Sequence, residues 1–249
     1  MKRIAIFLCV LLSASLLLHA ASRPTPAQPS LGIMTRSGDG VTTLSMPVQI
    51  AVVLTLLTLL PAVAMTITPF LRIVVVLHFL RQALGTQSTP SNQVLIGIAL
   101  FLAVLLFQPV AGEMYQRAWE PMESGQITPG QAFEEGAKPL KAFLVRYARE
   151  KDVRLFVEIS KAPAPRTPAD LPLQVLIPAY ILSELKTAFQ IGAVLFLPFL
   201  VIDIVVASVT LSIGMVQLPP VMLSAPFKIL IFVLVDGWNL VIGSLMKSF

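Results

Sequence analysis

The chain has 249 residues, of which 56% are hydrophobic and only 12% are charged, and its formal net charge is +5. Because a soluble domain usually carries about 25% charged residues, this composition excludes an ordinary soluble protein and indicates a membrane protein. The basic residues form no stripe with interleaved aromatic residues, so we expect no nucleic-acid partner and instead assign the excess positive charge to anionic membrane lipid.

Residues 1–22 have the pattern of a cleavable signal peptide. Two basic residues precede an apolar run at residues 4–18, and small residues that suit cleavage follow it. The alternative is that this segment is not cleaved and serves as a short membrane anchor. Residues 23–45 are rich in Pro, Ser, Gly and Thr, which predicts a flexible extracytoplasmic segment. Because the single cysteine is Cys9, cleavage would leave a mature chain without disulfides or thiolate metal sites.

Four strongly apolar zones follow, two within residues 46–112 and two within residues 175–249. They span residues 47–80, 94–111, 175–218 and 225–245. At 1.5 Å per residue, the first and third zones exceed the hydrocarbon thickness of about 30 Å. Pro61, Pro69 and Pro198 are expected to kink or interrupt them. The zones predict an all-α, multi-pass membrane protein with broken or kinked long helices.

Residues 113–174 hold most of the remaining polar residues and predict a small helical domain outside the membrane. Apolar residues recur at helical spacing from Gly130 to Ser160, and we expect Gly136 and Pro139 to divide this helix. Signal cleavage followed by one crossing per zone places this domain and the mature N-terminus outside the cytoplasm. The opposite placement stays open if a long zone is a hairpin, because a loop of this length lies at the limit of the positive-inside rule.

Ionisable residues in or beside the apolar zones are candidate sites, because placing one at the centre of a membrane helix costs about 2.5–3.5 kcal/mol. The candidates for assembly or buried charge pairing are Arg72, Arg81, Glu184, Lys186, Asp203, Lys228 and Asp236. Three interpretations remain open: a proton or ion relay, salt bridges between helices or subunits, and helices packed into a large complex. Glu184 and Lys186 are two residues apart and cannot face each other on a helix, so each needs another partner or reaches water.

The sequence shows no constellation of residues that indicates catalysis. Its two histidines are His19, within the signal region, and His78. Paired carboxylates, a nucleophile motif, a phosphate-binding loop and a metal-ligand cluster are not recognisable. We therefore expect neither an enzyme nor a cofactor or metal site.

Long stretches in the second half of the chain resemble a known family. They are SELKTAFQIG at 183–192, LPFLVIDIVVAS at 197–208 and PFKILIFVLVDGW at 226–238. Over residues 45–249 the chain resembles the FliP/SctR family of type III secretion export-gate proteins. The resemblance implies a pentameric ring that joins FliQ-like and FliR-like subunits in a conical channel. Unfolded flagellar subunits would pass through that channel, in contact with other membrane proteins of the export apparatus.

The resemblance also implies a pore gasket in the gate loop, residues 214–220. Family members carry consecutive methionines there, whose unbranched side chains suit a seal that yields to varied cargo. Only Met215 matches, whereas Val216 and Gln217 depart from the family pattern. The remaining residues that would set the loop geometry are Gly214, Pro219 and Pro220.

The cleavable signal and the extended polar regions favour the flagellar branch of the family, in the basal body at the bacterial inner membrane. The first alternative is an export-gate subunit of a virulence secretion system (injectisome). A second is a proton- or ion-coupled transporter that uses Arg72, Asp203, Lys228 and Asp236, and a third is a structural basal-body anchor.

Overall fold

The computed structural model describes residues 34–36, 42–44, 46–86, 88–161, 167, 170–214 and 219–249. The chain forms two compact units, Met1–Leu56 and Leu57–Phe249. The predicted signal peptide lies outside the described residues. In the first unit, β1 (Met34–Arg36) pairs antiparallel with β2 (Thr42–Leu44). The sequence did not predict this short hairpin.

The first apolar zone forms two helices, α2 (Met46–Ile67) and α3 (Phe70–Ala83). Pro61 lies inside α2 without ending it, whereas Pro69 occupies the position just before α3. Proline is tolerated at a helix start because the first backbone N–H groups have no partner within the helix. The break was therefore predicted correctly at Pro69.

The second apolar zone is longer than predicted. Helix α4 (Asn92–Met114) continues through the π-helical turn η2 (Tyr115–Trp119) into α5 (Glu120–Glu123). Together they form a helix of 32 residues. This helix passes without a break through residue 113, where we placed the start of a separate domain.

The polar region forms α6 (Pro129–Tyr147) and α7 (Glu150–Ser160). Thr128 and Gln131 form a reciprocal capping box that fixes the start of α6. The prediction that Gly136 and Pro139 divide this helix was wrong. Both residues are buried inside α6, and a Cβ at Gly136 would lie 3.1 Å from the Cβ of Ala118. A small residue is needed at this close contact, and packing outweighs the weak helix propensity.

The third zone forms one continuous helix, α8 (Leu173–Ser212), of 40 residues. The prediction that Pro198 interrupts this zone was wrong, because α8 continues through it. The fourth zone is broken instead: α9 (Pro220–Leu234) and α10 (Gly237–Lys247) meet at an angle of 68°.

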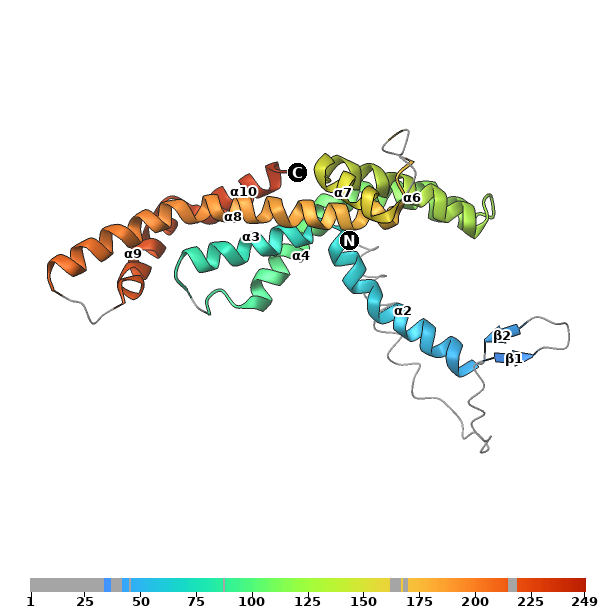
Figure 1. Cartoon of the computed structure of the whole chain (residues 1–249), viewed down its shortest axis with the longest axis horizontal. Coiled ribbons are helices and arrows are strands. Elements are labelled where there is room, and N and C mark those ends of the chain that lie inside the picture. The colour runs from blue at the N-terminus through green and yellow to red at the C-terminus, as the bar shows by residue number, and fades with distance from the viewer. Residues whose placement is uncertain are drawn as a thin grey trace, which may run out of the picture. The chain divides into compact units, whose positions relative to one another are not determined.

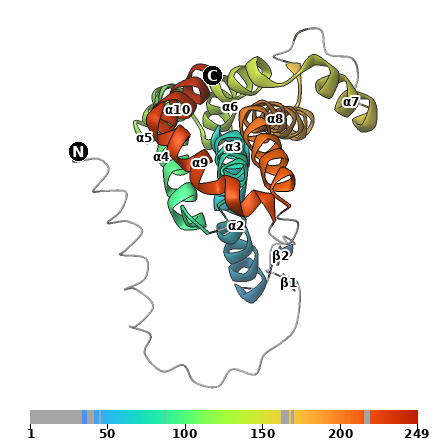
Figure 2. The same ribbon diagram turned by 90° about the vertical axis from the view of Figure 1, so that its left-hand side faces the viewer.

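Within the second unit, α3 lies between α4 and α8 (Figure 1 and Figure 2). One face of α3 is fully buried and consists of Ile73, Val76, Leu77 and Leu80. Their spacing of three and four residues places them on a single stripe. A second buried cluster packs α6 against the start of α8 around Leu144.

The contact between α3 and α8 depends on Gly192. A Cβ there would lie 2.5 Å from Cδ2 of Phe79, whose ring also packs against Phe189 and Phe196. We therefore expect Gly192→Ala to lower the free energy of unfolding by about 1–3 kcal/mol, measured by denaturant unfolding in detergent. Gly97→Ala is the matched control, since its Cβ would meet open space. Equal stabilities of the two variants would contradict this packing argument.

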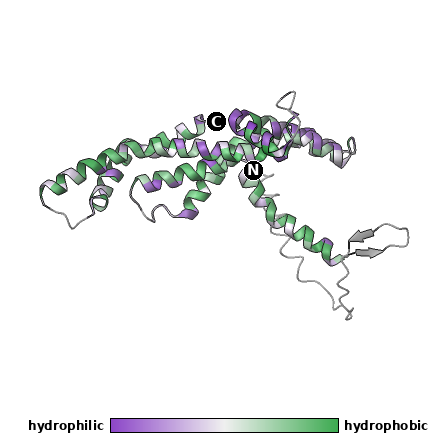
Figure 3. Cartoon of the chain, viewed as in Figure 1, coloured by the Kyte–Doolittle hydropathy of each residue, from purple (hydrophilic) through white to green (hydrophobic). Residues whose placement is uncertain are grey.

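Among the described residues, three helices are long and apolar enough to cross a membrane: α2, the Asn92–Glu123 helix and α8. The bent pair α9–α10 is a fourth candidate. Hydrophobic residues dominate α8 and α9, whereas hydrophilic residues gather on α6 and α7 (Figure 3). In the most apolar stretch of 18 residues of each helix, few residues are buried: 0% in α2, 17% in the Asn92–Glu123 helix and 11% in α8. Because the chain leaves this surface uncovered, it requires lipid or other subunits. The prediction of an all-α, multi-pass membrane protein is confirmed.

Candidate functional site

Arg72 and Glu184 form a buried ion pair between α3 and α8. Nε of Arg72 donates to Oε2 of Glu184 at 2.8 Å, and Nη2 donates to Oε1. Both side chains are buried, with 4% and 0% of their surface exposed. The two parallel hydrogen bonds match the planar guanidinium to the carboxylate, which is the strong geometry for such a pair. The charge of Glu184 is therefore neutralised within its own chain.

Asp203 and Lys228 form a second pair, between α8 and α9. Nζ of Lys228 donates to Oδ2 of Asp203 at 2.7 Å and to the backbone oxygen of Ala83 at 3.0 Å. The other carboxylate oxygen of Asp203 accepts a hydrogen bond from the hydroxyl of Ser224. Because Ala83 ends α3, this buried lysine holds three helices together.

Asp152 and Lys186 form a third pair, between α7 and α8. The Asp152 side chain is 2% exposed and accepts hydrogen bonds from Lys186 Nζ and, at 2.8 Å, from the Ser183 hydroxyl. Arg149 adds to this contact, because its backbone N–H donates to the same hydroxyl at 2.9 Å. Burial raises the pKa of Asp152, but the hydrogen bonds from Lys186 and Ser183 and the nearby charges outweigh it. The net effect holds the pKa below its ordinary value of 3.8.

The lowered pKa predicts acid-sensitive docking of α7. The contribution of the Asp152 carboxylate to stability is fully present above its unfolded-state pKa and is lost as the pH falls through the lower folded-state pKa. We expect Asp152→Asn to lower the unfolding midpoint at about pH 6, with a difference from the parent that vanishes near about pH 2. Glu150→Gln is the control, because Glu150 is 80% exposed on the same helix turn. A difference that stays constant over this range would contradict the prediction.

The other two candidate charges, Arg81 and Asp236, lack an ion pair within the described part of the chain. Arg81 donates to the side chain of Asn92 and to the backbone oxygen of Pro90. Asp236 is exposed in the bend before α10 and accepts a hydrogen bond from Asn239 at 3.1 Å. The seven candidates therefore do not form one cluster, and their role in assembly stays a prediction.

The proposed gasket residues Met215, Val216 and Gln217 lie outside the described residues. Gly214 follows the end of α8 with a φ of 82°, a conformation that glycine adopts without strain. Pro219 immediately precedes α9, and Pro220 is its first residue.

Sequence reasoning missed Asp152 as the partner of Lys186. Asp152 precedes Val153 and lies one helical turn before Phe156, so it shares the apolar face of α7. A carboxylate on such a face is costly to bury alone, which is the signal that predicts a buried cation partner. Arg149 and Ser224 were also missed, since nothing in their spacing distinguishes them from surface residues.

The three ion pairs between helices favour one interpretation of the charges in and beside the apolar zones. Each pair joins two helices and is completed by its own hydrogen-bond partners. A proton relay instead requires titratable groups in succession along a path. The geometry therefore suits electrostatic cross-links that fix helix positions.

These features define a multi-pass helical membrane protein whose helices are cross-linked by buried ion pairs. A sequence profile described as the FliP family matches residues 53–245. The chain belongs to the FliP family, as its resemblance predicted, and this membership agrees with the prediction that it is not an enzyme.

Several relatives match over most of their length, and each is named flagellar biosynthetic protein FliP. The protein of Pectobacterium carotovorum is 47% identical over 219 residues, which cover 88% of this chain and 85% of the relative. The Bacillus subtilis protein is 47% identical over 82% of this chain and 93% of its own length. The Caulobacter vibrioides protein is 45% identical over 100% of this chain and 92% of its own length.

Proposed function

We propose that this chain is a core channel subunit of the flagellar type III protein export gate. In this role it passes unfolded flagellar subunits across the inner membrane during flagellum assembly. The observation that carries the proposal is the match of residues 53–245 to the FliP family, together with relatives at 45–47% identity that are named as flagellar biosynthetic proteins. Their names favour the flagellar branch over the virulence branch.

The uncovered apolar surface supports assembly into a larger complex. Most residues in the apolar windows of α2, α4 and α8 remain unburied by the chain itself. Internal ion pairs hold α3, α8 and α9 together, so these outer surfaces are available to further copies and to FliQ-like and FliR-like subunits. A pentamer with a shared central pore is the assembly that we propose. Lipid and other export-apparatus proteins complete its surroundings in the basal body.

The placement of the polar region is part of the proposal. We assign residues 113–174 to the extracytoplasmic side, after removal of a signal peptide at residues 1–22. In this arrangement the gate loop, residues 214–220, lies at the pore, with Met215, Val216 and Gln217 as its seal. We expect Met215→Gly to raise the ion permeability of membranes that contain the assembled gate, whereas a structural anchor without a pore would show no change.

The proposal is tested in a flagellated bacterium that lacks its own FliP-family protein. We expect this chain to restore secretion of hook and filament subunits into the medium. Native mass spectrometry of the detergent-extracted complex should show a pentamer, alone or with FliQ-like and FliR-like chains. Arg154→Ala, which removes an exposed ion pair, is the control and should support normal secretion.

Two outcomes would contradict the proposal and point to its alternatives. A stable monomer that transports protons or ions by itself in liposomes would establish the transporter. Rescue of virulence-type secretion without rescue of flagellar secretion would establish the injectisome subunit.

A further inference from the structure

Helix α10 turns back toward the other helices after the bend that follows α9. Asp236 at this bend has a φ of 52°, in the left-handed region that few non-glycine residues occupy. A Cβ at Gly237 would lie 2.3 Å from the ring of Phe232, so a glycine is needed where the chain turns. The sequence therefore specifies the bend at the start of α10.

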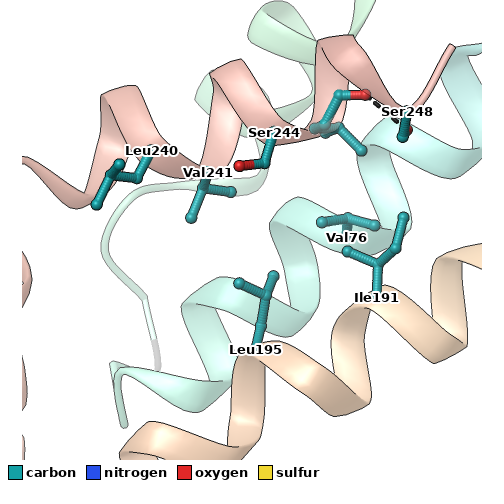
Figure 4. Close-up of a pocket in the computed structure, with 8 residues that line it drawn as sticks. Val76, Ile191, Leu195, Leu240, Val241, Ser244 and Ser248 are labelled. Atoms are coloured by element: carbon teal, nitrogen blue, oxygen red, sulfur yellow. Dashed lines mark hydrogen bonds between the residues drawn. The ribbon is translucent and has the colours of Figure 1, made fainter.

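The middle of α10 does not pack tightly onto α3 and α8. A cavity of about 280 Å³, partly open to the surroundings, separates them and has mainly aliphatic walls. Val76, Ile191 and Leu195 form the side contributed by α3 and α8, and Val241 and Ser244 face them from α10 (Figure 4). Since a cavity forfeits dispersion contacts, this part of the interface contributes little to holding α10 in place.

The end of α10 makes the specific contacts that the middle does not. Nη1 of Arg72 donates to the backbone oxygen of Ser248 at 2.9 Å and to its hydroxyl at 3.1 Å. The guanidinium carbon of Arg72 lies 3.8 Å from the centre of the Phe249 ring. Glu184 already occupies the other edge of this guanidinium. Ser248 and Phe249 therefore complete the partners of a buried cation.

Helix α6 reaches the same point. The hydroxyl of Tyr147, the last residue of α6, donates to the backbone oxygen of Phe249. The two aromatic rings meet edge to face with centres 5.6 Å apart. Residues from α3, α6 and α8 thus converge on the last two residues of the sequence.

We propose that Ser248 and Phe249 form a pin that holds α10 over the cavity, with the Phe249 ring stacked on Arg72 as its main contact. Loss of the pin releases α10 about its bend and opens the cavity, while α3 and α8 stay packed on each other. A guanidinium stacked on a ring in a desolvated site is a strong contact, because the cation and the face of the ring attract each other. The role of the pin is separate from the proposed channel function, since it concerns how one subunit folds.

The test measures how fast a maleimide labels a cysteine that faces the cavity. The full chain, in detergent, carries Cys9→Ser to remove its only native cysteine. The reporter is Val76→Cys, a fully buried position on the α3 wall of the cavity. We expect Phe249→Ala to accelerate labelling about tenfold, because opening of α10 exposes the reporter. Phe249→Tyr, which keeps a ring over Arg72, should label as slowly as the parent. The matched control is Lys247→Ala, at an exposed position on the same helix outside the cavity, which should leave the rate unchanged.

A second reporter separates release of α10 from general unfolding. Ala188→Cys, at a fully buried position of α8, should label slowly in both the parent and Phe249→Ala. Equal acceleration at both reporters would overturn the proposal, because the whole chain would then have loosened. Slow labelling of Val76→Cys in Phe249→Ala would overturn it as well. Phe249→Leu should label faster than the parent, and a parental rate would show that ring stacking is not the contact that holds the pin.

Discussion

Replacement of Glu184 by alanine should lower the free energy of unfolding by about 3–5 kcal/mol, the range for breaking a buried ion pair. The change leaves the guanidinium of Arg72 buried between α3 and α8 without its carboxylate, and Arg72 is only 4% exposed. Desolvation of this cation is then no longer offset by two strong hydrogen bonds. Denaturant unfolding in detergent, followed by circular dichroism, measures the loss.

The exposed pair Arg154–Glu150 is the control for Glu184→Ala. These side chains are 73% and 80% exposed, so water solvates either charge when its partner is removed. Glu150→Ala should therefore leave stability nearly unchanged. Equal losses for Glu184→Ala and Glu150→Ala would show that the Arg72–Glu184 pair is hydrated and does not cross-link the two helices.

Loss of Asp203 should destabilise the docking of α9 by a similar amount, about 3–5 kcal/mol. In Asp203→Ala, the ammonium of Lys228 stays buried with only the backbone oxygen of Ala83 as a hydrogen-bond acceptor among its observed contacts. Denaturant unfolding in detergent measures the lost stability. Labelling of a cysteine placed at Ser224, which is fully buried on α9, shows whether the docking of α9 has loosened. An unchanged labelling rate would contradict the prediction.

A double variant separates stability from a role of these charges in export. In Asp203→Leu with Lys228→Met, two apolar side chains replace both charges, so most of the stability lost in Asp203→Ala should return. If export also returns, the pair serves to hold α8 and α9 together. If the protein is stable but does not support export, the charges themselves act in the gate.

The sequence predicted the apolar zones well because burial and membrane crossing both depend on runs of apolar residues. It was less successful at breaks, as α8 demonstrates. Pro198 removes one backbone hydrogen bond, a cost that predicts an interruption, but long apolar helices tolerate proline when neighbouring groups compensate. The break at Val235 and Asp236 carries no proline and depends on the close contact of Gly237 with Phe232. Such a contact exists only in three dimensions.

The candidate site could be predicted as a set of residues but not as a set of pairs. The cost of intramembrane charge identified Arg72, Glu184, Asp203 and Lys228 from sequence alone. Their pairing could not follow from spacing, because Arg72 and Glu184 are 112 positions apart. The contacts of Phe249 could not be predicted from the sequence either. An aromatic residue after an apolar zone has no sequence feature that indicates contact with a buried cation.

The continuous helix α8 has a mechanical consequence. At 1.5 Å per residue its 40 residues extend for about 60 Å, twice the hydrocarbon thickness of a bilayer. Its first half is bonded to α7 through Ser183 and Lys186, and its last residues precede the proposed gate loop. A tilt of about 10° of a helix of this length displaces its far end by about 10 Å. A force on α7 that tilts α8 therefore also moves the end of α8 that precedes the proposed gate loop.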